Sequence, residues 1–154
     1  MNDGAVAPTV VPEALTRYTG FLLSRMGTVA QKRFSSRLEA LELTPRMWGT
    51  LNILEAEAPV TQGGLCKRTG MDPSSMVATI DDLEQRGLVE RRAHPSDRRA
   101  YALHVTDAGR ETLAQGREVV KEVQDELLAP LDEAEREQLR GLLLRLVAAA
   151  GHAS

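Results

Sequence analysis

The sequence is poor in cysteine and in aromatic residues, with one cysteine and 3% Phe, Trp and Tyr. A single cysteine excludes an internal disulfide and a multi-cysteine zinc site, and it fits a reducing cytoplasm. With so few aromatic side chains, Leu, Val, Ala and Met must build the core, which favours helices over an aromatic-rich β-sandwich. No apolar run approaches the roughly 18 residues of a membrane span, and the N-terminal residues lack the basic-then-apolar pattern of a signal peptide.

Motifs that carry enzyme chemistry are also missing. The sequence has no P-loop, no G-x-S-x-G, no dinucleotide-binding glycine fingerprint and no His-rich metal motif. His94, His104 and His152 are scattered, and no two of them have the spacing of a helical metal site. We therefore expect neither an enzyme, nor a metal site, nor a resident cofactor.

What the sequence does contain is a series of helix start and stop signals. At 154 residues we expect one domain, preceded by a loose arm over residues 1–12. Apolar periodicity predicts helices over about 13–40, 45–57, 62–69, 73–86, 107–128 and 133–150. Residues able to cap the last five of these helices precede each of them: Thr44, Thr61, Asp72, Thr106 and Asp132.

Between the fourth and fifth helices lies a predicted β-hairpin with a basic tip. Strand-like runs at Leu88–Arg92 and Ala100–Val105 flank a turn that contains Pro95 and ends in Arg98 and Arg99. Residues 86–99 carry a net charge of +3, which leaves −6 on the rest of the chain. A helix followed by a basic hairpin predicts a winged helix-turn-helix, whose natural partner is double-stranded DNA.

The predicted fold is therefore mainly α with a small β-wing. The elements follow the order α-α-α-α-β-β-α-α, and a third short strand near Pro59 and Val60 would complete the wing sheet.

These residues resemble the MarR family of bacterial transcription regulators. The resemblance rests on Leu83, Gly87–Arg91, Asp97–Arg99 and Val105–Gly109, and it covers about residues 13–148. It implies a homodimer with intertwined helices at 13–40 and 107–150, around a DNA-binding lobe at 44–105. It also implies a regulator, more often a repressor, that binds a pseudo-palindromic operator and responds to a small molecule or an oxidant.

The resemblance also implies which residues would contact DNA. The helix at 73–86 would enter the major groove, and the wing would place Arg99 in the minor groove, with Asp97 holding the wing by pairing with Arg91 or Arg99. The expected DNA-binding residues are Ser74, Ser75, Ala78, Thr79, Asp82, Arg86, Arg98 and Arg99. Ala78 and Asp82 stand where many relatives place a long donor, so guanine readout should be weak, and specificity should depend on the wing and on DNA shape.

Three alternatives stay open at this point. Cys66 is expected to fill the core, but a thiol-based redox sensor is the competing interpretation. Trp48 could line an effector pocket or belong to the core. The chain could also be a winged-helix protein-interaction module without sequence-specific DNA binding, which Ala78 and Asp82 favour and Arg98 and Arg99 oppose.

Overall fold

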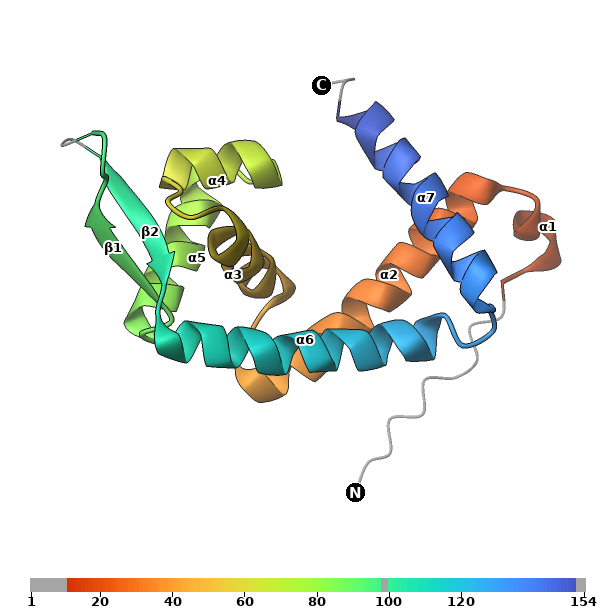
Figure 1. Ribbon diagram of the computed structural model, residues 1–154. Helices are drawn as coiled ribbons and strands as arrows, with labels where there is room; N and C mark the ends of the chain where they lie inside the picture. Colours follow the sequence, from red (N-terminus) through yellow and green to blue (C-terminus); the bar gives the residue numbers. More distant parts are fainter. Residues whose placement is uncertain (1–10, 98–99, 152–154) are drawn as a thin grey trace.

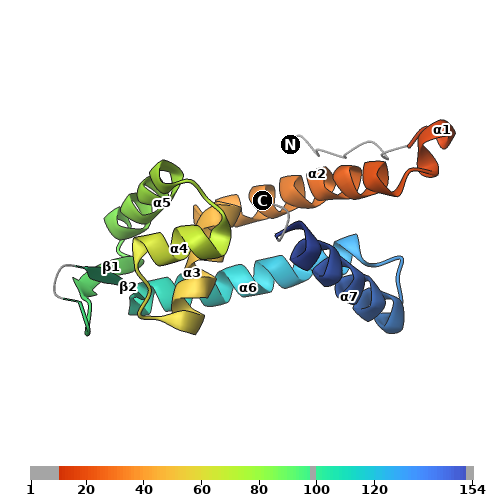
Figure 2. The same cartoon turned by 90° about the horizontal axis from the view of Figure 1, so that it is seen from above.

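The computed structural model describes residues 11–97 and 100–151 and shows a lobe attached to a long helical arm (Figure 1). Three helices and a hairpin form the lobe, α2 packs against α6, and α7 follows at the far end of α6 (Figure 2). The elements are α1 (Glu13–Thr16), α2 (Thr19–Leu38), the 3-10 helix η1 (Glu39–Leu41), α3 (Pro45–Glu57), α4 (Gln62–Thr69), α5 (Pro73–Gln85), β1 (Val89–Ala93), β2 (Tyr101–Val105), α6 (Asp107–Leu127) and α7 (Glu133–Ala150).

All five predicted helix caps are confirmed. The side chains of Thr44, Thr61, Asp72, Thr106 and Asp132 each accept a hydrogen bond from a backbone N–H three residues later, over 2.9–3.2 Å. Such bonds satisfy donors that the first turn of a helix leaves unpaired. The last of them belongs to a full capping box, as the sequence predicts.

The single long helix predicted over 13–40 is wrong in its details. The chain leaves the helix at Arg17 and Tyr18, where Tyr18 adopts an extended conformation and begins α2 as its N-cap. The segment around this break combines Thr16, Tyr18 and Gly20, which favour helix weakly, so apolar periodicity alone does not carry the helix through. At the other end, η1 tightens the last turn before the chain reverses.

The hairpin forms as predicted, with each strand beginning one residue later than expected. β1 and β2 pair antiparallel, and Val89 lies opposite Val105. The predicted third strand is reduced to one bridge between Val60 and Leu103. This bridge nevertheless fixes the hairpin to the start of the helix-turn-helix, because the Leu103 N–H donates to the Val60 carbonyl over 2.9 Å.

The core lies in the lobe and at its junction with the arm. Its fully buried members include Leu38, Leu51, Leu54, Leu65, Met76, Ile80, Leu83, Leu103 and Leu113. By contrast, α7 buries none of its residues, although the sequence places a leucine stripe on it. None of the described helices is long and apolar enough to cross a membrane.

Candidate nucleic-acid interface

The helix predicted to enter the major groove, α5, starts at a strongly hydrogen-bonded carboxylate. Asp72 accepts from the Ser74 hydroxyl over 2.5 Å and from the Ser75 N–H over 2.9 Å. The side-chain hydrogen bond from Ser74, followed by those from Ser75, holds the pKa of Asp72 well below its ordinary value. The first turn is therefore held firmly, with a fixed negative charge beside the exposed N-terminal end of α5.

One face of α5 is anchored and the other is free for contact. Met76, Ile80 and Leu83 are fully buried and fix the helix on the core. The opposite side presents Ser74, Ala78 and Asp82 exposed, with Ser75 and Thr79 half-buried. The Thr79 hydroxyl donates to the Ser75 carbonyl over 2.8 Å, so its oxygen is oriented mainly as an acceptor.

Arg86 does not share this exposed face. Its guanidinium donates to the backbone carbonyls of Leu41 and Glu42, at the end of η1. The side chain is only 22% exposed. A guanidinium held this way offers few free N–H groups to a phosphate.

The wing is tied to α5 through Arg91. Arg91 of β1 forms ion pairs with Asp81, over 2.9 Å, and with Glu84, both on α5. The expected pairing of Asp97 with Arg91 or Arg99 stays a prediction, because Arg99 lies outside the described residues. Arg92 pairs with Glu90 on its own strand. Arg98 and Arg99 lie outside the described residues, so the placement of Arg99 in the minor groove and the contact of Arg98 with DNA stay predictions.

The junction between wing and α6 explains the spacing of the motif Gly87–Arg91 and Val105–Gly109. The Thr106 hydroxyl accepts from the Gly109 N–H and donates to the Gly87 carbonyl over 2.6 Å. A side chain at position 109 would place its Cβ 2.1 Å from the Leu88 carbonyl oxygen. Thr106 and Gly109 therefore hold the base of the wing against the first turn of α6.

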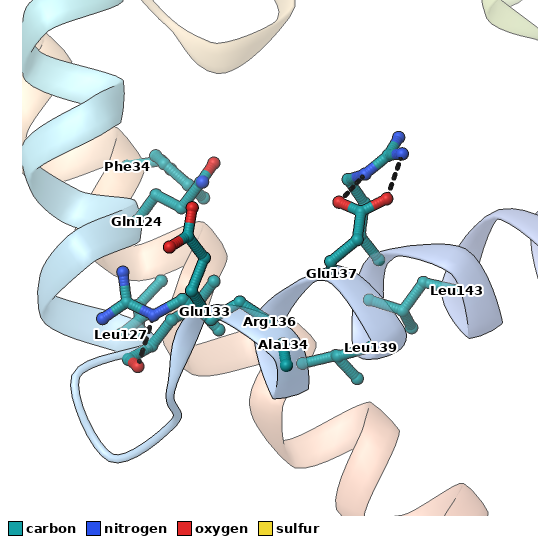
Figure 3. A pocket seen from close by; sticks show the side chains of 11 residues that line it. Phe34, Gln124, Leu127, Glu133, Ala134, Arg136, Glu137, Leu139 and Leu143 are labelled. Carbon is teal, nitrogen blue, oxygen red and sulfur yellow. Dashed lines mark hydrogen bonds and ion pairs between the residues drawn. The ribbon is translucent and has the colours of Figure 1, made fainter.

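Two hollows flank the helices of the arm. The first, of about 850 Å³, lies between α2, α6 and α7, and its lining residues include Phe34, Leu127, Arg136, Glu137, Leu139 and Leu143 (Figure 3). The second, of about 1010 Å³, lies where the arm meets the lobe, between α2, η1, the start of α3 and α5. We call the first the arm hollow and the second the junction hollow.

The junction hollow reveals a residue that the sequence analysis missed. Arg46, on the first turn of α3, lines it together with Ser75, Ala78 and Thr79. The sequence offered a reason to consider Arg46, because it directly follows the helix start signal at Thr44 and Pro45 and therefore lies on the first turn of a helix. Val77 on α5 and Tyr101 on β2, which the sequence analysis did not consider, are 38% and 66% exposed.

The remaining candidates lie in or beside the core. Trp48 is among the lining residues of neither hollow, and its indole edge lies against Gly116 of α6. Cys66 is half-buried and packs against the core cluster. Among residues 11–97 and 100–151, no group of three or more His, Cys, Asp and Glu side chains could hold a metal ion.

Comparison with known proteins places this arrangement in a family. A model of the MarR family matches residues 41–100. A protein described as a transcriptional regulatory protein for the hcr operon of Thauera aromatica is 35% identical over 128 residues, which span 82% of this chain and 77% of that protein.

Solved structures of one regulator, CouR, share the fold. CouR from Rhodococcus jostii RHA1 bound to p-coumaroyl-CoA is 31% identical with a TM-score of 0.77, covering 88% of this chain and 95% of that one. The transcriptional repressor CouR bound to a 23-mer DNA duplex is 30% identical with a TM-score of 0.82, covering 90% and 98%. Members of this family regulate transcription and are not enzymes. The chain belongs to the MarR family of transcription regulators.

Proposed function

We propose that the protein is a homodimeric repressor that binds a pseudo-palindromic operator and releases it when an effector binds. The observation that carries this proposal is the exposed face of α5, anchored by three buried side chains and joined at its end to the wing. The DNA-bound structure of the repressor CouR supports it. Such a regulator acts on chromosomal DNA in the cytoplasm.

The two DNA-contacting elements have different tasks in this proposal. The first turns of α5 enter the major groove, where Val77 and Ala78 meet thymine methyl groups and Asp82 accepts from a cytosine amino group. Ser74, Ser75 and Thr79 contact phosphates or base edges. Arg99 of the wing enters the minor groove, and Arg98 contacts the nearby backbone. Arg46 adds a cation beside α5.

The dimer is formed by residues 13–40 and 107–150, and residues 44–105 form the DNA-binding lobe. Large apolar side chains are exposed on both arm segments: Phe21, Leu23, Met26, Leu142, Leu143, Leu144, Leu146 and Val147. An apolar surface of this extent is typical of an interface. A two-fold axis through it would place the two copies of α5 about one DNA turn apart, on the two halves of the operator.

The effector binds in the junction hollow in this proposal. That hollow separates α5 from the end of α2 and the start of α3, so a ligand in it would change how the lobe sits on the arm. CouR binds p-coumaroyl-CoA, which supports a small organic effector. A coupling free energy of about 1–3 kcal/mol between the hollow and DNA would change operator occupancy 5- to 150-fold.

Fluorescence anisotropy with the intergenic duplex beside the protein's own gene tests the proposal. A shuffled duplex of the same composition, measured at the same salt concentration, is the control. We expect the intergenic duplex to bind at least about 1,000-fold more tightly than the shuffled one. Equal binding of both duplexes would contradict operator recognition, and binding of neither would favour the protein-interaction module.

A further inference from the structure

Arg86 occupies an unusual position for an arginine of a DNA-reading helix. It is the C-cap residue of α5, and its guanidinium reaches across to the end of η1, 44 and 45 residues earlier in the chain. One terminal nitrogen donates to the Glu42 carbonyl and the other to the Leu41 carbonyl, the latter over 3.0 Å. The two bonds use the planar fork of the guanidinium. We call this pair of hydrogen bonds the clasp.

The backbone carbonyls at the end of η1 are suitable acceptors for this clasp. Carbonyl groups at the end of a helix have no partner inside the helix and carry partial negative charge. Here the chain reverses at Glu42, which adopts a left-handed conformation with φ of 52° and ends η1. The Glu42 carboxylate is 3.6 Å from Arg86 but 85% exposed, so water screens it. The backbone carbonyls therefore provide most of the attraction.

The clasp connects the DNA-reading helix to the arm. The arm ends in α2 and η1, and the same end lines the junction hollow together with Ser75, Ala78 and Asp82 of α5. Met76, Ile80 and Leu83 hold α5 on the lobe, and Arg86 joins its last turn to the end of η1. The tilt of α5 relative to the arm then depends on this contact.

We propose that Arg86 is a positioning residue, which sets operator affinity by fixing α5 against the arm and not by contacting DNA. The inference rests on the proposed function, because it concerns DNA binding. It replaces the expectation that Arg86 binds DNA directly. The two roles differ in their salt dependence, since an arginine that neutralises a phosphate steepens the dependence of log K on log salt, and a positioning arginine does not.

The test compares Arg86→Ala, Arg86→Lys and the control Glu42→Gln, after circular dichroism and light scattering have shown that each is folded and has the wild-type mass. Glu42→Gln removes the exposed carboxylate but keeps both carbonyl acceptors. We expect Arg86→Ala to weaken operator binding by about 3- to 30-fold with an unchanged salt slope, and Glu42→Gln to bind like the wild type. Arg86→Lys keeps the charge but lacks the planar fork, so it should recover only part of the loss.

Two results would overturn the proposal. A salt slope that flattens by about one unit in Arg86→Ala, with full recovery in Arg86→Lys, would show a phosphate contact. Affinity unchanged in Arg86→Ala would show that the clasp does not position α5.

Hydrogen exchange without DNA separates this inference from the proposed function. We expect the amides of residues 83–88 to exchange faster in Arg86→Ala than in the wild type, because the last turn of α5 loses its anchor. If the wild type binds no duplex, the proposed function fails, while the exchange data still report on the clasp. Identical exchange in both proteins would contradict the clasp even if the wild type binds DNA.

Discussion

Gly109 lies at a point where no side chain fits. A Cβ there would be 2.1 Å from the Leu88 carbonyl oxygen and 2.7 Å from the Val105 side chain, so the backbone of the wing would have to shift. We expect Gly109→Ala to lower the free energy of unfolding by about 1–3 kcal/mol. Urea denaturation measures the change.

Gly63→Ala is the matched control for this prediction. Position 63 lies in a helix as position 109 does, but a Cβ there meets nothing within 4 Å. This substitution should raise the free energy of unfolding by up to about 1 kcal/mol, since alanine favours helix over glycine. Equal effects of the two substitutions would show that Gly109 is not required by close packing.

The carboxylate of Asp72 should make stability depend on pH in one direction. Hydrogen bonds, first from Ser74 and then from Ser75, lower the pKa of Asp72 in the folded protein from its ordinary value of 3.8. The folded state therefore favours the charged form, and this stabilisation is complete above pH 3.8 and is lost as pH falls toward the folded pKa. Asparagine caps helices about as well but does not titrate in this range.

The comparison of wild type with Asp72→Asn isolates this effect. We expect the wild type to have the higher midpoint of thermal unfolding at neutral pH, because the helix dipole favours the carboxylate. The difference should shrink as pH falls below about 4. Circular dichroism melts at several pH values measure it, and a difference that stays constant over the whole range would contradict the assigned hydrogen bonds.

At the scale of elements, the sequence predicted the features that depend on neighbouring residues, but it did not predict the contacts between distant segments. Thr44, Asp72 and Asp132 act on N–H groups three residues away, so the sequence itself shows their partners. The break at Tyr18 was missed because several weak preferences add up there without a proline or a cap. A third strand was predicted where the structure has a single bridge, because pairing at Val60 depends on how the loop meets β2.

The charged residues of the site show the same limit. The sequence identified Arg86 and Arg91 as candidates but could not show what they bind. Arg86 donates to the carbonyls of Leu41 and Glu42. Arg91 pairs with the carboxylates of Asp81 and Glu84. Tertiary packing decides which of these groups a long side chain reaches. Burial of Met76, Ile80 and Leu83 was predictable, because helical spacing alone places them on one face.

The wing should contain one arginine that contacts DNA and one that positions the hairpin. We expect Arg99→Ala to weaken operator binding by about 1–3 kcal/mol and to flatten the salt slope by about one unit. Arg91→Ala removes the ion pairs to α5 and leaves the tip unchanged, so binding should weaken with the slope preserved. Anisotropy titrations at three salt concentrations distinguish the two.

Two further substitutions serve as references for Arg99→Ala. Asp97→Ala should act like Arg91→Ala, through a looser hairpin. Ser75→Ala should change sequence preference more than salt dependence, since Ser75 lies on the helix proposed to enter the major groove. If Arg99→Ala binds the operator as tightly as the wild type at every salt concentration, the wing has been assigned the wrong role.

At the scale of the whole molecule, the unusual feature is a helix with no core of its own. α7 starts with a capping box and runs for 18 residues, yet it buries no residue within the chain. It stands out from the lobe at the far end of α6 (Figures 1 and 2). Isolated helices of this length are marginal in water, so its stability must come from packing against something outside one chain. In the proposed dimer, a second copy would provide the same apolar surface in return.

Glutamate substitutions on α7 test this directly. Leu142 and Leu146 are 46% and 54% exposed and lie one helical turn apart on the same face of α7. In a two-fold interface, glutamates at these positions would bring the negative charges of the two copies close together. We expect light scattering at micromolar concentration to give twice the chain mass for the wild type and the monomer mass for Leu142→Glu combined with Leu146→Glu. Gln85→Glu adds a charge on the exposed surface of α5, outside both arm segments, and should remain dimeric. Operator affinity should fall with the loss of the dimer, because one lobe reads only half of a pseudo-palindrome. A monomeric wild type, or a double variant that stays dimeric and binds DNA normally, would place the interface elsewhere.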